Sequence, residues 1–196
     1  MPTVTGLFDS YDHAREAVSA LEAAGIGSSD ISIITHDEDH TGSSAADGAG
    51  AGAGIGAVAG GAGGLLAGLG LVAIPGVGPV VAAGWLAATL AGVAAGAVAG
   101  GAAGGLLGAL TGSGVPEAEA DFYAEGVRRG GSIVVARVNE AQVDAATAIL
   151  RQSRVVDPVA RRRAFEDEGW TRFDENAPPY SEEEKRRLRE SYRSLP

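Results

Sequence analysis

Glycine recurs at every fourth position in two series in the middle of this chain, and no charged residue lies between Asp47 and Glu117. A spacing of four leaves one face of a helix without side chains, so a second helix can approach closely. We therefore predict that these glycines mediate self-association into a homo-oligomer. The two series are Gly48, Gly52, Gly56, Gly60, Gly64, Gly68, and Gly92, Gly96, Gly100, Gly104, Gly108, Gly112.

The glycine-rich segment is predicted to be a helical hairpin with arms over Gly48–Ala73 and Val80–Gly112, joined by a turn rich in Pro and Gly. Glycine costs a helix roughly 1 kcal/mol per residue relative to alanine, so these helices need close packing to form. The rival is a silk-like sheet, because Gly48–Gly54 alternates with period two, but that alternation ends at Ile55 while the spacing of four continues. The pattern therefore favours two helices that pack through their glycine faces, an arrangement called a glycine zipper.

Two partners for this hairpin remain open. Either arm is long enough to cross a hydrocarbon layer of about 30 Å, which takes about 20 residues. Large aliphatic residues are sparse, however, and the flanks are acidic rather than basic. We therefore expect either association with a lipid bilayer or a self-packed bundle outside the membrane.

The segments on either side of the glycines predict an α+β domain. Alternating apolar residues, helix caps and turn glycines follow the order strand, helix, strand, then helix, strand, helix, strand. This order is the split βαβ arrangement of a ferredoxin-like sandwich. We expect the first half of this head at residues 1–35, the hairpin insert at 36–115, the second half at 116–158 and a charged tail with a terminal helix at 159–196. The expected elements are strands 4–8, 31–35, 132–138 and 154–157, and helices 11–24, 117–129 and 140–152.

Two stretches resemble the bacterial general stress protein family of the YflT type, whose longer members are described as low-temperature-induced or heat-induced. The first combines Gly6-Leu7-Phe8, Leu21–Ile26 and Asp30–Ile34; the second combines Tyr123–Val135 with Ala148–Leu150. The resemblance covers residues 3–157. It implies a role in bacterial stress physiology without an established chemistry, and it provides no catalytic residue.

Few residues suggest a chemical site. His36, Asp39 and His40 lie close enough in sequence to be weak candidate ligands of a divalent metal, but we favour a solvated linker here. His13 is expected at the surface. Arg128 and Arg129 precede two glycines, which is typical of a helix C-terminus and only secondarily of a phosphate site. We predict no enzyme, no catalytic residue and no cofactor.

Charge and composition exclude several partners and compartments. The formal net charge is −10, with the acidic excess in the first 47 residues, and a nucleic-acid partner would require a positive face. The chain has no Cys, so no disulfide or thiolate site can form. The N-terminus lacks the features of a signal peptide. We expect a cytoplasmic or inner-membrane-associated protein that is not secreted.

The tail joins a basic and aromatic segment to a predicted last helix. Ser181 and Glu184 have the spacing of a capping box, and Glu182 and Glu183 are placed to pair with arginines four residues later. Trp170 and Phe173 need a surface on which to be buried, and we expect them to dock on a neighbouring subunit or, more simply, to belong to a solvated tail.

Together these observations favour a non-enzymatic stress-response protein that self-assembles through its glycine-zipper hairpin and is associated with a membrane or forms a protective assembly. The alternative is a soluble, ligand-sensing ferredoxin-like domain whose hairpin serves only for oligomerisation.

Overall fold

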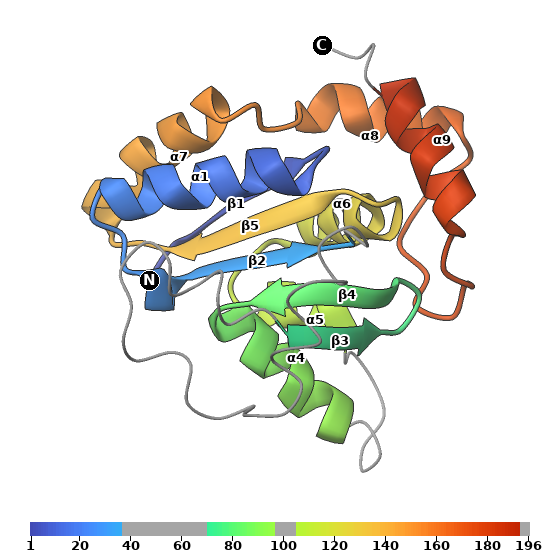
Figure 1. Ribbon diagram of the computed structural model, residues 1–196, viewed down its shortest axis with the longest axis horizontal. Helices are drawn as coiled ribbons and strands as arrows, with labels where there is room; N and C mark the ends of the chain where they lie inside the picture. Colours follow the sequence, from blue (N-terminus) through green and yellow to red (C-terminus); the bar gives the residue numbers. More distant parts are fainter. Residues whose placement is uncertain (37–69, 97–104, 193–196) are drawn as a thin grey trace.

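The protein is described by a computed structural model for residues 1–36, 70–96 and 105–192 (Figure 1). Its centre is an antiparallel sheet with the strand order β1-β5-β2-β4-β3. Strands β1, β2 and β5 come from the two head segments, and β3 and β4 form a hairpin that extends the sheet beyond β2. The strands are β1 (Thr3–Phe8), β2 (Ile31–Thr35), β3 (Gly70–Ile74), β4 (Gly78–Ala83) and β5 (Ser132–Arg137).

Helices cover both faces of this sheet. Figure 1 shows α1 and α7 together on one side and α4 and α5 on the other. Two short 3₁₀ turns, Ser28–Asp30 and Glu140–Gln142, precede β2 and α7. The helices are α1 (Tyr11–Ala23), α4 (Trp85–Gly96), α5 (Gly105–Gly112), α6 (Glu117–Arg128), α7 (Val143–Gln152), α8 (Pro158–Asp167) and α9 (Glu182–Tyr192).

Each face of the sheet has its own hydrophobic core, because successive side chains of a strand point to opposite faces. In β5, Val134 and Ala136 join the core beneath α1 and α7, whereas Ile133 and Val135 join the core that includes α4, α5 and α6. The second core also contains aromatic residues of the tail. The sheet is therefore the middle layer of three.

The structure confirms the head elements that the sequence predicts, with ends that differ by up to three residues. One predicted element is wrong: residues 154–157 do not form a strand. The backbone N–H of Val156 donates a 2.8 Å hydrogen bond to the carbonyl of Leu7, but no ladder follows. Asp157 instead caps α8, whose first residue is Pro158. A ferredoxin-like sandwich would have its fourth strand here, so that assignment remains a prediction.

The predicted helical hairpin is wrong over residues 70–83, where the chain forms β3 and β4. The turn between the predicted arms is present, but it joins strands: Gly76 and Gly78 adopt positive φ angles of 73° and 97°. β4 pairs with β2, so this part of the predicted insert extends the sheet of the head. The second predicted arm is helical only from Trp85 onward among the described residues.

The tail begins with a helix, α8, where the sequence predicts none. Asp157 accepts 2.8 Å hydrogen bonds from the backbone N–H groups of Val159 and Ala160 at the start of α8. The predicted capping box of α9 is confirmed, since Ser181 and Glu184 exchange hydrogen bonds in both directions. Across the ranges that the structure describes, no helix has both the length and the apolar character needed to cross a bilayer.

Candidate functional site

The glycines predicted for self-association fall partly within the described residues. Gly92 and Gly96 lie in α4, and Gly108 and Gly112 lie in α5, which packs against α4 in the same chain. A Cβ atom added to Gly112 would have no heavy atom within 4 Å. The remaining members lie outside the described residues: Gly48, Gly52, Gly56, Gly60, Gly64, Gly68, Gly100 and Gly104.

Of the three weak metal-ligand candidates, His36 is described, and Asp39 and His40 are not. His36 is not part of a solvated linker, because it is only 5% exposed. Its Nε2 lies 2.9 Å from the carbonyl of Val77, and Nζ of Lys185 lies 2.9 Å from Nδ1 and 2.8 Å from Nε2. Because a carbonyl can only accept, Nε2 is the ring nitrogen that donates, and Nδ1 is then the one that accepts from Lys185. Among the described residues, no cluster of three or more His, Cys, Asp or Glu is placed to hold a metal ion.

Lys185 joins the tail to the end of β2. Its side chain is 2% exposed, and its Nζ also contacts Oε1 of Glu182 at 2.6 Å. Burial lowers the pKa of His36 from its usual value of 6.5, and the charge of Lys185 lowers it further, against the hydrogen bond to Val77 and the charge of Glu182. His36 is therefore held in the neutral form that can accept from Lys185.

The aromatic residues of the tail are buried on their own chain. Trp170 is 8% exposed and Phe173 is 2% exposed, and both belong to the core that contains α6. Phe165 of α8 packs between Phe122 of α6 and Tyr192 of α9, at ring-centroid distances of 5.6 and 5.7 Å. The surface that these rings cover is thus supplied by the head.

A buried ion network strengthens this attachment. Arg129 follows α6, and its Nε donates a 2.6 Å hydrogen bond to Glu125, whose side chain is 1% exposed. Its Nη1 bonds both to Glu168 and, at 2.6 Å, to the hydroxyl of Tyr192. Arg129 therefore fastens both tail helices to the head, which is a more specific role than the helix C-terminus that the sequence indicates.

A cavity of about 750 Å³ lies where the tail meets the head. Ligand pockets are typically about 300–1,000 Å³, so its size suits a small molecule. Three parts of the chain line it: the start of α1, the connection from α7 to α8 with the first turn of α8, and α9. The lining residues are Asp9, Ser10, His13, Arg154, Val155, Val156, Asp157, Arg161, Arg186, Arg189 and Glu190.

The cavity is richer in cations than the chain as a whole. Four arginines and three carboxylates line it, although the chain carries a net charge of −10. Arg161 donates a 2.8 Å hydrogen bond to Asp9, and the carboxylate of Asp157 is occupied by backbone N–H groups of α8. Arg186 and Arg189 form no ion pair within the part of the chain that the structure describes. Positive charge therefore remains available at the cavity wall.

Arg154 has an unusual backbone at this wall. Its φ is 60°, and among the described residues it is the one residue other than glycine that has a positive φ. It follows the end of α7, where a left-handed residue closes the helix and glycine is usual. The ends of α1, α6 and α8 each have glycine there: Gly25, Gly130 and Gly169, with φ of 86°, 93° and 89°.

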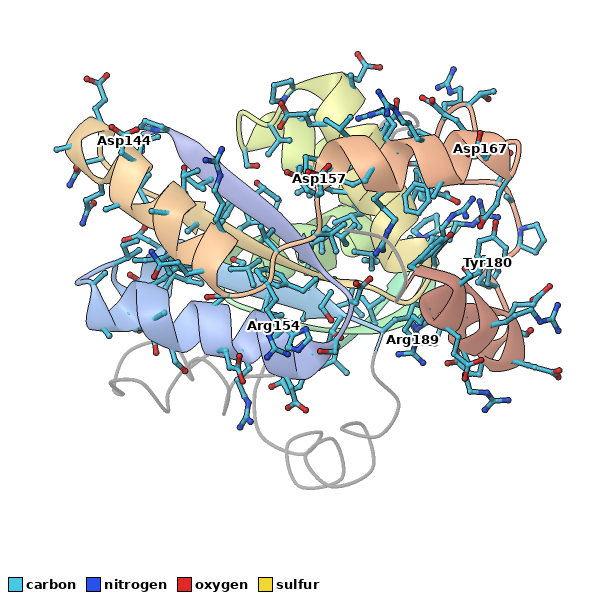
Figure 2. All side chains as sticks on the ribbon, turned by 90° about the horizontal axis from the view of Figure 1, so that it is seen from above. Asp144, Arg154, Asp157, Asp167, Tyr180 and Arg189 are labelled. Atoms are coloured by element: carbon cyan, nitrogen blue, oxygen red, sulfur yellow. The ribbon has the colours of Figure 1, made fainter. Side chains whose placement is uncertain are left out.

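Figure 2 labels Arg154 beside the N-terminal end of α1, Asp157 at the start of α8 and Arg189 on α9. Nη1 of Arg154 lies 3.3 Å from Nε2 of His13, which the structure places at the cavity wall. This site cannot be recognised in the sequence, because its members are spread from Asp9 to Glu190. The single local signal is an arginine where a helix-closing glycine belongs.

The sequence comparisons concern the first part of the chain. Residues 3–72 match the family model of the heat-induced stress protein YflT domain, a range that includes β1, α1 and β2. No curated protein and no solved structure matches the chain. The family suggests a stress-response role. The resemblance to the YflT type of general stress protein that the sequence indicates is therefore shown over residues 3–72.

Proposed function

We propose that this protein is a non-enzymatic stress-response protein that binds a small ligand in the cavity between head and tail. The observation that carries the proposal is the composition of the cavity wall, to which both the head and α9 contribute. A ligand held there contacts both parts at once. The head that carries the cavity is, on this proposal, a variant of the ferredoxin-like sandwich. The strand expected beside β1 is absent, and the β3–β4 hairpin extends the sheet at its opposite edge, beyond β2.

Binding would stabilise the docked tail. A ligand that contacts α9 only when the tail is docked favours that state by its binding free energy. The tail already rests on a few buried polar links, Lys185 with His36 and Arg129 with Glu168 and Tyr192. A bound ligand would thus make the docked tail more stable. The state of the tail would then depend on whether the ligand is present, as in a sensor.

A cavity-filling substitution tests this function. His13→Trp places a large ring at the wall, and Glu16→Trp adds the same ring at an exposed position of the same helix, outside the cavity. Both variants and the wild type are screened against a metabolite library by ligand-observed NMR. We expect at least one compound to bind the wild type and Glu16→Trp but not His13→Trp. Absence of any such compound would contradict the proposed function.

A second function, self-association through the glycine series, is supported by Gly112, whose missing side chain faces open space. Gly112→Leu would place a large side chain on that face, whereas Ala118→Leu adds comparable bulk at an exposed position of α6. We expect light scattering to show an oligomer for the wild type and Ala118→Leu and a smaller particle for Gly112→Leu. A wild-type monomer would contradict self-association.

A further inference from the structure

We propose that the ligand of this cavity is a small phosphorylated molecule, whose phosphate is bound by Arg154, Arg186 and Arg189. This inference rests on the proposed function and names the chemical class that the site takes. Arginine presents a planar fork of N–H donors that matches phosphate oxygens in pairs, and its positive charge persists at every physiological pH. Three such groups from two separate parts of the chain surround a dianion better than they surround a neutral ligand.

The conformation of Arg154 is the first support. A left-handed backbone is unfavourable for every residue with a Cβ atom, and the ends of α1, α6 and α8 avoid this cost with glycine. The chain keeps an arginine at the corresponding position of α7, which is also the position that faces the cavity. Backbone strain of this kind persists where the side chain is needed.

The buried arginine of the site is the second support. Arg161 is 5% exposed and lines the cavity, and its Nε has no hydrogen-bond partner among the described residues. That Nε is covered by the protein's own atoms, so Arg161 acts on a ligand through its positive charge rather than through this donor. Its guanidinium also lies 4.2 Å from the ring centre of Tyr192, so it is held in place rather than free to turn into solvent.

The helix ends give the third support. Ser10 caps α1 and Asp157 caps α8, and both residues line the cavity. Two helix N-termini therefore end at the same wall. The carboxylate of Asp157 already compensates that of α8, so the start of α1 is the terminus whose partial positive charge adds to that of the arginines.

The remaining carboxylates favour a ligand larger than phosphate alone. Glu190 lines the cavity from α9, and Asp9 is 38% exposed at its side chain while it bonds Arg161. Carboxylates accept hydrogen bonds from hydroxyl or amino groups. The cavity volume leaves room for such groups beside the phosphate, as in a sugar phosphate or a nucleotide.

Calorimetric titration of the full-length protein with inorganic pyrophosphate and with ADP, at constant low ionic strength, tests the inference. We expect saturable binding of at least one of the two, weakened at least tenfold by Arg154→Gly and by Arg189→Gln. Arg187→Gln is the matched control, because Arg187 lies on the same helix but outside the cavity and pairs with Glu183. Arg154→Gly removes backbone strain, so its melting temperature should not fall, and weaker binding by this variant cannot be ascribed to unfolding.

Equal affinity in Arg154→Gly, Arg189→Gln and wild type would overturn the inference, as would an equal loss in Arg187→Gln. Citrate and glucose are titrated in parallel to separate this failure from that of the proposed function. Binding of citrate or glucose that His13→Trp abolishes, without binding of either phosphate compound, overturns the phosphate class and leaves a ligand-binding cavity. If no titrant binds and the metabolite screen is also negative, both proposals fail.

Discussion

Nζ of Lys185, in the last helix of the tail, donates a 2.9 Å hydrogen bond to Nδ1 of His36, which directly follows β2. The two residues are 149 positions apart in the chain. Both residues are buried, and the bond depends on the protonation of His36, which must be neutral at Nδ1 to accept. The docking of the tail is therefore linked to pH.

We predict that the tail becomes less stable as the pH falls below 6.5. The pKa of His36 is lowered in the folded protein, mainly by burial, so the unfolded chain binds the proton more readily in this range. Neutral His36 contributes fully to the free energy of unfolding above pH 6.5, and this contribution is lost as the pH drops from there towards the lowered pKa of His36. Lys185 adds to this effect, and the carboxylate of Glu182 opposes it.

Thermal unfolding between pH 8 and pH 5 measures this dependence, with His36→Gln as the comparison. The variant removes the titrating ring, so its unfolding should vary less with pH than that of the wild type below pH 6.5. Identical pH profiles for the two proteins would show that His36 does not control the tail.

Removing Glu125 should be strongly destabilising. Its side chain is 1% exposed and pairs with Arg129, which is 4% exposed. Breaking a buried ion pair leaves the other charge without compensation and costs about 3–5 kcal/mol. We expect urea unfolding to show a loss of this size for Glu125→Ala. The control is Asp12→Ala, which removes the exposed partner of Arg15 and should cost less than about 1 kcal/mol.

Replacing Arg154 by glycine should stabilise the fold. The left-handed backbone costs a residue with a Cβ atom roughly 1–2 kcal/mol, partly offset by the extra freedom of glycine in the unfolded chain. We therefore expect a gain of up to about 1 kcal/mol in urea unfolding. Arg151→Gly, in the last turn of α7, should instead lose about 1 kcal/mol. Losses of equal size in both variants would show that Arg154 is not strained.

Gly84, between β4 and α4, should tolerate no side chain. Its φ is 89°, and a Cβ atom there would collide with the carbonyl of Ile31 and lie 2.7 Å from Oγ of Ser32. That hydroxyl accepts the hydrogen bond of the Leu86 N–H at 3.0 Å. Gly84→Ala should cost about 3 kcal/mol or more, since strain and a clash combine.

Gly114→Ala provides the comparison for Gly84→Ala. Its φ of 92° is similar, but an added Cβ atom has no neighbour within 4 Å, so only the backbone strain of roughly 1–2 kcal/mol remains. A similar loss for the two variants in urea unfolding would contradict the close approach at Gly84.

Much of the head could be predicted from sequence because its signals are local. The second strand, Ile31–Thr35, is reproduced residue for residue, and α1 ends at the expected glycine. The β3–β4 hairpin could not be predicted in the same way. Its residues are apolar on both faces, so they carry no period that separates a strand from a buried helix. The turn at Pro75 and Gly76 is predicted correctly, but the glycine spacing favours helices on either side of it, where the structure has strands.

The cavity could not be predicted because it depends on tertiary placement. Arg154, Arg161 and Arg189 come from three elements, and their approach requires α8 and α9 to dock on the head. Docking in turn depends on His36, which sequence reasoning placed in a linker, and on Arg129, which it assigned to a helix end. Of these residues, Arg154 alone has a signal in its own stretch of sequence: it follows α7 at the position where α1, α6 and α8 are followed by glycine.

Hydrogen exchange of α9, Glu182–Tyr192, with and without pyrophosphate and ADP in turn tests the account most directly. The cavity is lined by Arg186, Arg189 and Glu190 of this helix, so a phosphate bound there should slow exchange throughout α9. We predict slower exchange in the wild type and a smaller slowing in Arg154→Gly at the same subsaturating ligand concentration. Exchange in wild-type α9 that is the same with and without either compound would contradict a phosphate-binding cavity that holds the tail.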